Sequence, residues 1–270
     1  MNVQIIKSSS NERLKVFKTL ITSKGIKEHH QFLLSGVKLI EEFLHSKTVN
    51  ELQSKPARFN PKCFIFNSED QGLWPPFLQN NTNIEVIIIS KDIFNELDVV
   101  GTKQPLLVLE FKDFEKKDFE KNPVGLELIS PLGDPRNLGS LIRSAVGLNV
   151  CEIILTQEST HPYLPQAVKA SAGAALYADF KKSDLAVAEI PTVGNNFALA
   201  LEGKTITSIT WPKDLRLWVG EEGPGLKITK HQKNNLQLVQ IPTVRIESLN
   251  AMVAATVAMW EWKKSLQMPN

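Results

Sequence analysis

The second half of the chain alternates short apolar runs with helical stretches, and this alternation constrains the fold more than any other feature of the sequence. Five runs have the length and apolar character of buried strands, at residues 124–130, 151–156, 197–203, 215–220 and 236–242. Helical stretches lie between or after them, at 140–148, within 161–180 and at 248–264. Apolar strands that alternate with helices are typical of a parallel sheet covered by helices. The pattern therefore predicts an α/β fold for this half.

The first 111 residues show a separate alternation of the same kind. Helical spacing of apolar side chains predicts helices over 11–25, ended by Gly25, and over 37–46, and Ser90 or Asp92 is expected to start a third. Short apolar runs predict strands within 31–35 and at 62–67, 84–90 and 106–111. We therefore expect a small α/β domain over 1–111. The charged stretch 112–123 predicts a linker, so that a second domain would occupy 124–270.

The formal net charge of +2 conceals an uneven distribution. Residues 1–62 carry eleven Lys and Arg against five Asp and Glu, a balance of +6, whereas the rest of the chain carries 20 against 24, or −4. A basic amino-terminal section suits an anionic polymer such as nucleic acid. An ordinary solvated surface can have the same composition, so the charge alone does not decide between them.

Several classes of function receive no support from the sequence. No apolar stretch of about 18 residues is free of charge, and the amino terminus lacks the hydrophobic centre of a secretory signal, so a cytoplasmic protein is expected. The two cysteines and five histidines lie at no ligand or triad spacing. We therefore expect no metal site and no Ser-His-Asp chemistry.

Three polar stretches follow strands of the second half, where parallel sheets place their ligands. In DPRNLGSLIRSA, 134–145, either Asp134 or Asn137 can cap a helix. LWVGEEGPGL, 217–226, runs from a strand into a Gly-rich acidic turn, and in IPTVRIESLNAMVAA, 241–255, Ser248 or Asn250 can cap the last helix. Each stretch also has a structural explanation when it is taken singly. The first could be an ordinary capped helix, the second an acidic surface turn, and the third a close-packed helix, for example at a dimer interface.

Taken together, the order and spacing of these stretches resemble the three motifs of the SpoU (TrmH-like) branch of the SPOUT superfamily of RNA methyltransferases. The segment PQAVKASAGA, 165–174, also resembles this family, and the likeness extends from about residue 125 to 263. Residues 8–44 resemble the small substrate-binding domain that many members carry in front of the catalytic one.

The resemblance implies a small N-terminal α/β RNA-binding domain and a C-terminal SPOUT domain whose parallel sheet contains a deep trefoil knot. It also implies a homodimer and S-adenosyl-L-methionine as methyl donor. On the family's pattern, the catalytic polar residues are Asn137, Arg143, Glu222, Ser248 and Asn250. The cofactor pocket is implied to use Gly220, Ile241, Pro242 and Leu249.

The implied reaction is methylation of a ribose 2′-hydroxyl in structured RNA, with ribosomal RNA favoured over transfer RNA. The motifs contain no histidine, and a guanidinium is essentially always protonated. Arg143 is therefore expected to hold the adjacent phosphate and the hydroxyl, with Asn137 and Glu222 fixing it. The alternative is an RNA-binding protein on the same scaffold without catalysis.

Three residues depart from the family's pattern. Thr243 and Arg245 occupy a loop that usually reads Ile-Pro-Met with a glycine two places later, and the distance from Ile241 to Ser248 is one residue shorter than usual. Glu221 stands where a small or neutral residue is common. The loop around the adenine is therefore expected to have a different shape.

Overall fold

The computed structural model describes residues 2–8, 10–48, 58–70, 75–221 and 225–267. Contacts group the chain into two compact units: unit 1 comprises Met1–Asp113 and His161–Gly173, and unit 2 comprises Phe114–Thr160 and Ala174–Asn270. Residues 161–173, which the sequence places in the second domain, thus pack with the first unit. The domain limits 1–111 and 124–270 stay a prediction. None of the helices in the described ranges has both the length and the apolar character that a membrane span requires.

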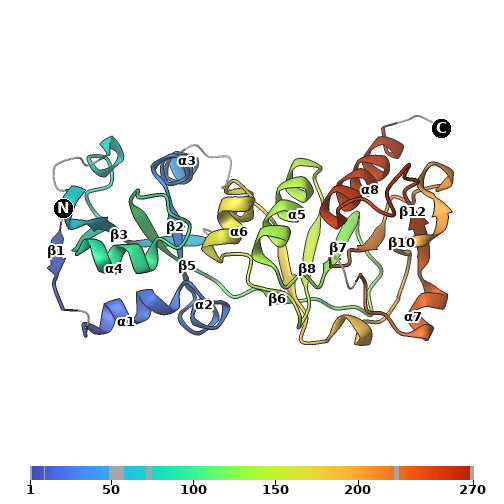
Figure 1. Ribbon diagram of the computed structural model, residues 1–270, viewed down its shortest axis with the longest axis horizontal. Coiled ribbons are helices and arrows are strands. Elements are labelled where there is room, and N and C mark those ends of the chain that lie inside the picture. Colours follow the sequence, from blue (N-terminus) through green and yellow to red (C-terminus); the bar gives the residue numbers. More distant parts are fainter. Residues whose placement is uncertain (1, 9, 49–57, 71–74, 222–224, 268–270) are drawn as a thin grey trace. The chain divides into compact units, whose positions relative to one another are not determined.

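Unit 1 is built on a five-stranded mixed sheet (Figure 1). Its strands are β1 (Val3–Ile6), β2 (Gln31–Ser35), β3 (Phe59–Asn67), β4 (Glu85–Ile89) and β5 (Leu106–Phe111), in the order β1-β4-β3-β5-β2. β1, β4 and β3 are parallel, and β5 is antiparallel to β3 and β2. Its α-helices are α1 (Glu12–Thr19), α2 (Ser23–His29), α3 (Val37–Thr48), α4 (Lys91–Leu97) and α6 (Pro165–Ala170), with short 3-10 turns at Ser68–Asp70 and Pro76–Leu78.

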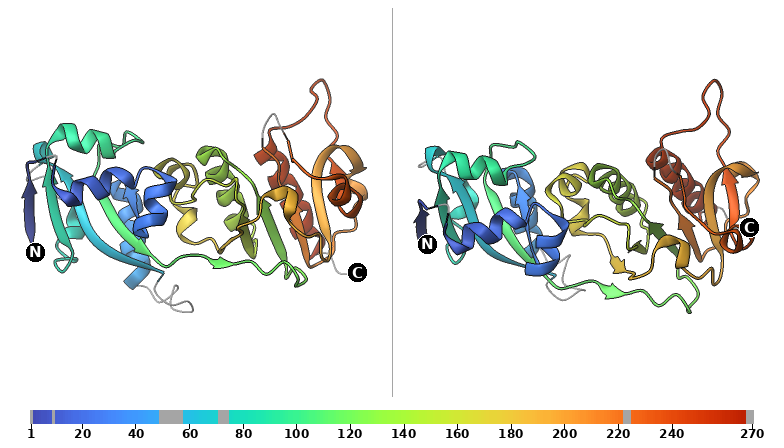
Figure 2. Two further views of the ribbon diagram at one scale, coloured as in Figure 1. Left: turned by 90° about the horizontal axis from the view of Figure 1, so that it is seen from below. Right: turned by 60° about the horizontal axis from the view of Figure 1, so that its bottom comes forward.

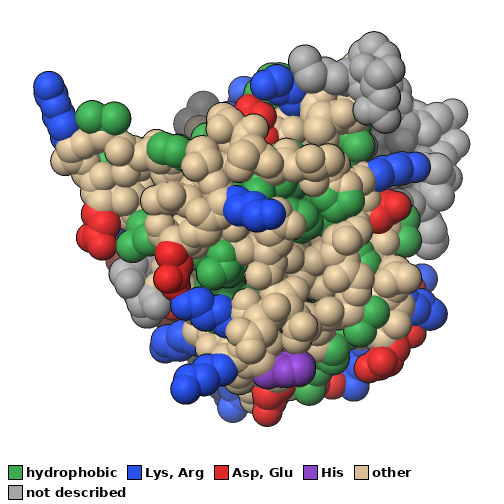
Figure 3. Space-filling view, turned by 90° about the vertical axis from the view of Figure 1, so that its right-hand side faces the viewer, with side chains coloured by type: hydrophobic (Ala, Val, Ile, Leu, Met, Phe, Trp, Pro, Cys, Tyr) green, Lys and Arg blue, Asp and Glu red, His purple; other side chains and the backbone are tan. Residues whose placement is uncertain are grey.

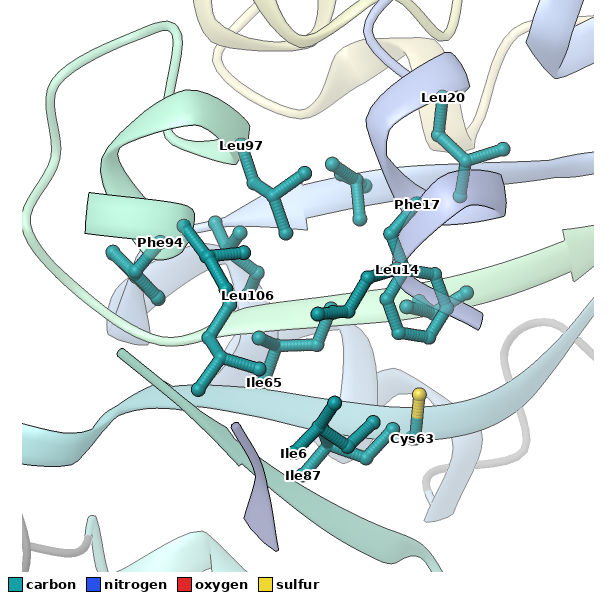
Figure 4. Close-up of a cluster of buried hydrophobic side chains, with 14 residues drawn as sticks. Ile6, Leu14, Phe17, Leu20, Cys63, Ile65, Ile87, Phe94, Leu97 and Leu106 are labelled. Atoms are coloured by element: carbon teal, nitrogen blue, oxygen red, sulfur yellow. The ribbon is translucent and has the colours of Figure 1, made fainter. Parts of the chain in front are cut away.

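One part of the core of unit 1 lies between the sheet and the helices α1 and α4. Figure 4 shows Leu14 and Phe17 of α1 together with Phe94 and Leu97 of α4, directed toward Ile65 and other strand residues. These side chains are almost completely buried. Strands at 31–35, 84–90 and 106–111 and the helix after Ser90 were thus predicted correctly from their apolar pattern.

The first predicted helix, over 11–25, is wrong in its extent. The structure has two helices there, because the chain turns after Thr19 and Thr22 caps a new helix, its Oγ1 accepting a hydrogen bond from Gly25 N at 3.1 Å. Gly25 therefore lies inside α2 instead of ending a helix. α2 ends at His30, whose φ of 49° is left-handed.

Unit 2 contains a seven-stranded sheet in which all the paired strands are parallel. Its strands are β6 (Glu115–Lys116), β7 (Leu126–Ser130), β8 (Glu152–Leu155), β9 (Phe180–Lys182), β10 (Asn196–Thr205), β11 (Leu215–Trp218) and β12 (Gln237–Gln240), in the order β12-β10-β11-β7-β8-β9-β6. The predicted parallel α/β fold is confirmed. The trefoil knot that the family resemblance implies stays a prediction.

The helices of unit 2 are α5 (Pro135–Gly147), α7 (Lys230–Asn235) and α8 (Ala251–Ser265), with 3-10 turns at Ala174–Leu176, Val187–Glu189 and Ile206–Ser208. α5 and α8 pack side by side (Figure 1), and Thr256 Oγ1 donates to Ser144 Oγ across their contact at 2.8 Å. The helix expected within 161–180 is short, because Ala172 and Gly173 adopt positive φ angles of 50° and 82° after α6.

Charged side chains are buried at the edge where β7, β8 and β11 begin. The Arg216 side chain is fully buried, and its Nε lies 2.9 Å from Glu127 Oε2. Lys117 Nζ contacts Glu127 Oε1 at 2.7 Å and Glu152 Oε2 at 2.6 Å. Lys117 belongs to the stretch predicted as a linker, which also supplies β6 and the buried ring of Phe119 under the Arg216 guanidinium. This stretch is therefore bound to the sheet of unit 2.

Candidate active site

A cavity of about 690 Å³ opens at the carboxyl ends of β10, β11 and β12 and at the start of α8. Its volume falls within the usual range for small-molecule sites. Five of the predicted site residues line it, namely Gly220, Ile241, Ser248, Leu249 and Asn250. The second and third polar stretches of the sequence therefore converge on one cavity, as expected for loops that leave the same edge of a parallel sheet.

The first polar stretch forms the start of α5. Asp134 caps the helix, because its Oδ1 accepts hydrogen bonds from Arg136 N at 2.8 Å and Asn137 N at 2.9 Å. The bond from the Asn137 backbone is the chief cause that holds the pKa of Asp134 below its usual range. The sequence left Asp134 and Asn137 open as caps, and the structure selects Asp134.

Asn137 and Arg143 both lie on α5 but do not line the cavity. Asn137 is half-buried, and Arg143 is exposed on the helix face that also carries Arg136 and Ser140. Neither Asn137 nor Arg143 forms a side-chain hydrogen bond or ion pair within the part of the chain that the structure describes. Arg143 thus lies on α5, the helix that packs against α8, and its exposed guanidinium is available to a ligand.

The second stretch forms a tight turn after β11. A Cβ on Gly220 would lie 2.7 Å from Leu226 N and 2.8 Å from Gly225 C, so no larger residue fits without moving the backbone. The next residue, Glu221, accepts a hydrogen bond from Gly225 N through its backbone carbonyl at 3.1 Å. The predicted catalytic Glu222 lies outside the described residues.

The third stretch runs from β12 to α8, and Figure 2 shows this loop projecting from the rest of unit 2. Ile241 is half-buried, whereas Pro242 is exposed and does not line the cavity. Arg245 has a φ of 69°, so an arginine holds the left-handed conformation that favours glycine. Thr243 Oγ1 donates to the backbone carbonyl of Ile246 at 2.7 Å and closes the turn.

Asn250 has a structural role in addition to its place in the cavity wall. Its Oδ1 accepts hydrogen bonds from Met252 N at 3.0 Å and Val253 N at 3.2 Å, which makes it the N-cap of α8. Of the two caps that the sequence allowed, Asn250 is the one used. Ser248 is exposed beside it. The backbone N–H groups at the start of α8 therefore face the cavity region with the positive end of the helix dipole.

Acidic side chains dominate the charges of the cavity wall. Glu202, Glu221 and Glu247 line it together with one lysine, Lys233, which is paired with Glu202. Figure 3 shows a face of the molecule on which acidic and basic side chains are mixed, with hydrophobic side chains exposed between them. Glu247 forms no ion pair with any residue that the structure describes, and such a carboxylate suits a ligand with a cationic centre better than one that carries phosphates.

Three charged members of this wall, Glu202, Lys233 and Glu247, were missed by sequence reasoning. Glu202 and Lys233 are 31 residues apart and pair only because β10 and α7 both adjoin β12. β10 also bulges, since its register against β12 shifts between Leu199 and Lys204, and the bulge carries Glu202 to the cavity. The only sign of this pair in the sequence was that Glu202 lies near the end of the predicted strand 197–203. The described residues contain no group of three or more His, Cys, Asp or Glu placed to hold a metal ion.

Comparison with known proteins gives consistent likenesses. Residues 128–260 match the SpoU rRNA Methylase family. The ribosomal RNA small subunit methyltransferase G 2 of Syntrophobacter fumaroxidans is 31% identical over 262 residues, which cover 96% of this chain but only 49% of that protein, so the chain spans about half its length. The 23S rRNA (guanosine(2553)-2′-O)-methyltransferase RlmP of Bacillus subtilis is 26% identical over 260 residues, covering 94% of this chain and 97% of that one.

The fold is shared with solved structures. The SpoU methyltransferase AviRb from Streptomyces viridochromogenes, in complex with AdoMet, matches with a TM-score of 0.77 at 19% identity, covering 96% of this chain and all of that one. At this identity the likeness speaks for the fold. Because it spans nearly the whole chain, it includes both the sheet of unit 1 and the parallel sheet of unit 2.

Proposed function

We propose that this chain is a member of the SpoU rRNA methylase family and that it transfers the methyl group of S-adenosyl-L-methionine to a ribose 2′-hydroxyl of structured RNA. The observation that carries the proposal is the cavity at the ends of β10, β11 and β12, where residues of two family motifs meet. Relatives that match over almost the whole chain or over most of it are named as ribose methyltransferases of 23S rRNA.

The cavity fits the cofactor in volume and in charge. Leu199, Leu226 and Leu238 offer apolar surface for an adenine, and the turn at Gly220 presents backbone groups at close range. The carboxylate of Glu247, which forms no ion pair among the described residues, complements a cation, and S-adenosylmethionine, when bound, supplies an electrophilic methyl group on a positively charged sulfur. A phosphate-bearing cofactor would meet this carboxylate as a like charge.

We assign Arg143 to the RNA. Its guanidinium is exposed on α5 and cannot act as a base at ordinary pH, but it can hold a phosphate by two parallel hydrogen bonds. Held there, it orients the neighbouring 2′-hydroxyl toward the methyl donor; as the new O–C bond forms, the S–C bond of the donor would break and the hydroxyl proton would pass to solvent. Asn137, six residues earlier on α5, is assigned to fix the arginine, and Glu222, Ser248 and Asn250 complete the polar set.

The preferred substrate is ribosomal RNA. The relatives aligned over nearly the whole of their own length include RlmP, named for 23S rRNA, and the basic amino-terminal section suits an RNA backbone. We also propose a cytoplasmic location, which action on ribosomal RNA would require. Unit 1 is assigned to substrate binding.

We propose that the protein is a homodimer through the catalytic domain. α8 exposes an apolar stripe at helical spacing, in which Val253 is 50% and Trp260 52% exposed and Val257 is half-buried. Exposed aromatic side chains such as Trp260 are enriched at interfaces. Sedimentation should give a dimer for the wild type and a monomer for Trp260→Glu; a monomeric wild type would refute the assignment.

The test of the function is transfer of labelled methyl from S-adenosylmethionine to separated ribosomal and transfer RNA fractions that lack the modification. Label in ribosomal RNA, retained in alkali-resistant dinucleotides and lost with Arg143→Ala, is expected. Arg143→Lys keeps the charge but not the planar fork and should lose most of the activity. No label in either fraction, without cofactor binding, would favour the RNA-binding protein without catalysis.

A further inference from the structure

Glu221 forms a side-chain contact that joins two of the polar stretches. Its Oε1 accepts a hydrogen bond from the backbone N–H of Gly133 at 2.6 Å. Gly133 immediately precedes Asp134, the cap of α5, whereas Glu221 follows Gly220 in the turn after β11. A hydrogen bond to a carboxylate is among the stronger kinds in proteins.

The contact lies just beyond the point where two neighbouring strands leave the sheet. β7 and β11 are parallel neighbours, and the last backbone bond between them runs from Val219 N to Ile129 O at 3.0 Å. Past this bond the chains separate, one toward α5 and the other toward the Gly-rich turn. The carboxylate of Glu221 thus adds one connection where the backbone ladder has ended.

The Glu221 carboxylate comes from a tight turn after β11. The backbone of Glu221 pairs with Gly225 in an antiparallel bridge, and Gly220 lies so close to Leu226 that a Cβ there would meet Leu226 N at 2.7 Å. On the other side, Asp134 fixes the first turn of α5. A single hydrogen bond therefore links Glu221, which lines the cofactor cavity, to the start of α5, the helix that carries Asn137 and Arg143.

We propose that Glu221 is a positioning residue, whose carboxylate fixes the start of α5, and through it Arg143, relative to the cofactor cavity. The inference rests on the proposed methyl transfer. In-line attack depends on the placement of the hydroxyl to within about 1 Å, so a loose helix start lowers turnover more than it weakens binding. The position at which the family usually has a small or neutral residue thus carries a connecting side chain in this chain.

Two substitutions of Glu221 separate the hydrogen bond from the charge. Glu221→Gln keeps an acceptor oxygen for Gly133 N, whereas Glu221→Ala removes it. We expect Glu221→Ala to lower kcat about tenfold with KM for S-adenosylmethionine changed less than about threefold, and Glu221→Gln to stay within about threefold of the wild type. Equal losses in both variants would show that the charge acts directly on a ligand and would overturn the proposal. Glu115→Ala, on an exposed carboxylate of β6, is the control.

Gly133→Ala perturbs the same contact from its other side. A Cβ at Gly133 would lie 3.0 Å from Glu221 Oε1, so the carboxylate must shift. We expect this change to lower kcat in the wild type and to add almost nothing in Glu221→Ala, because the contact is already lost there. Additive effects of the two changes would refute the connection.

Hydrogen exchange gives a readout that does not depend on activity. The Gly133 amide should exchange slowly in the wild type and in Glu221→Gln and fast in Glu221→Ala; equal rates in all three would overturn the proposal. Full activity of Glu221→Ala beside an active wild type would refute the inference alone. An inactive wild type would refute the proposed function, and with it the catalytic consequence.

Discussion

Removal of the Arg216 side chain should destabilise unit 2 more than any surface change. The guanidinium is fully buried on β11 and donates to Glu127 Oε2 at 2.9 Å, to Val193 O at 3.0 Å and to Lys121 O at 2.6 Å. In Arg216→Met the stem is retained, but two carbonyls and a buried carboxylate lose their donor. Breaking one side of a buried ion pair costs about 3–5 kcal/mol. Because Lys117 still contacts Glu127, we expect about 4 kcal/mol.

Urea unfolding followed by tryptophan fluorescence measures this loss, since four of the five tryptophans lie in residues 211–262 of unit 2. About 4 kcal/mol corresponds to a melting temperature lower by about 8–16 °C. Lys121→Ala is the matched control, because that side chain is 79% exposed and pairs only at the surface with Asp118; it should change stability by less than about 0.5 kcal/mol. A loss below about 1 kcal/mol in Arg216→Met would refute the reasoning.

Three further predictions follow from single residues. Gly220→Ala should raise the Kd for S-adenosylmethionine at least about tenfold in calorimetry, because its Cβ meets backbone at 2.7 Å, whereas Gly147→Ala meets nothing within 4 Å and should bind normally. Burial lowers the pKa of His161 to about 3 from its ordinary 6.5, so the folded state binds fewer protons than the unfolded state between these values and stability falls as pH falls through this window. Circular dichroism should show about 2 kcal/mol lost from pH 7 to pH 5, and His161→Gln should lack this part of the slope. Arg245→Gly should leave cofactor affinity unchanged, since φ is already 69°, while Arg245→Val should weaken it; equal affinities would show that the loop tolerates strain.

The parallel sheet could be predicted because its strands are apolar on both faces. Leu126–Ser130 and Leu215–Trp218 are wholly buried, and such runs do not depend on distant partners for their pattern. Helix starts were also accessible, since Asp134 and Asn250 act through bonds to backbone groups two and three residues away. The convergence of Gly220 and Asn250 followed from the topology of parallel strands.

Other features depend on contacts that no local pattern contains. Lys117 and Phe119 looked like parts of a solvated linker, because the buried Arg216 that holds this segment is almost 100 residues away. The early turn between α1 and α2 was missed because Gly25 was interpreted as a stop signal, although Thr22 provides the cap one turn earlier. The Gly133 contact likewise joins residues 88 positions apart.

The assignment of residues 161–173 to unit 1 has a consequence for dissecting this protein. Tyr163 stacks on Phe32 with ring centroids 4.5 Å apart and is almost completely buried, although the chain before and after this segment belongs to unit 2. The polypeptide thus passes between the units three times, near residues 113, 160 and 173. A protease cut within 112–123 would sever only one passage. A fragment of residues 124–270 would lack Phe32 and the other apolar partners of Tyr163. Because unit 1 needs a segment from the second half of the chain, neither unit can be replaced by a cut at a single junction.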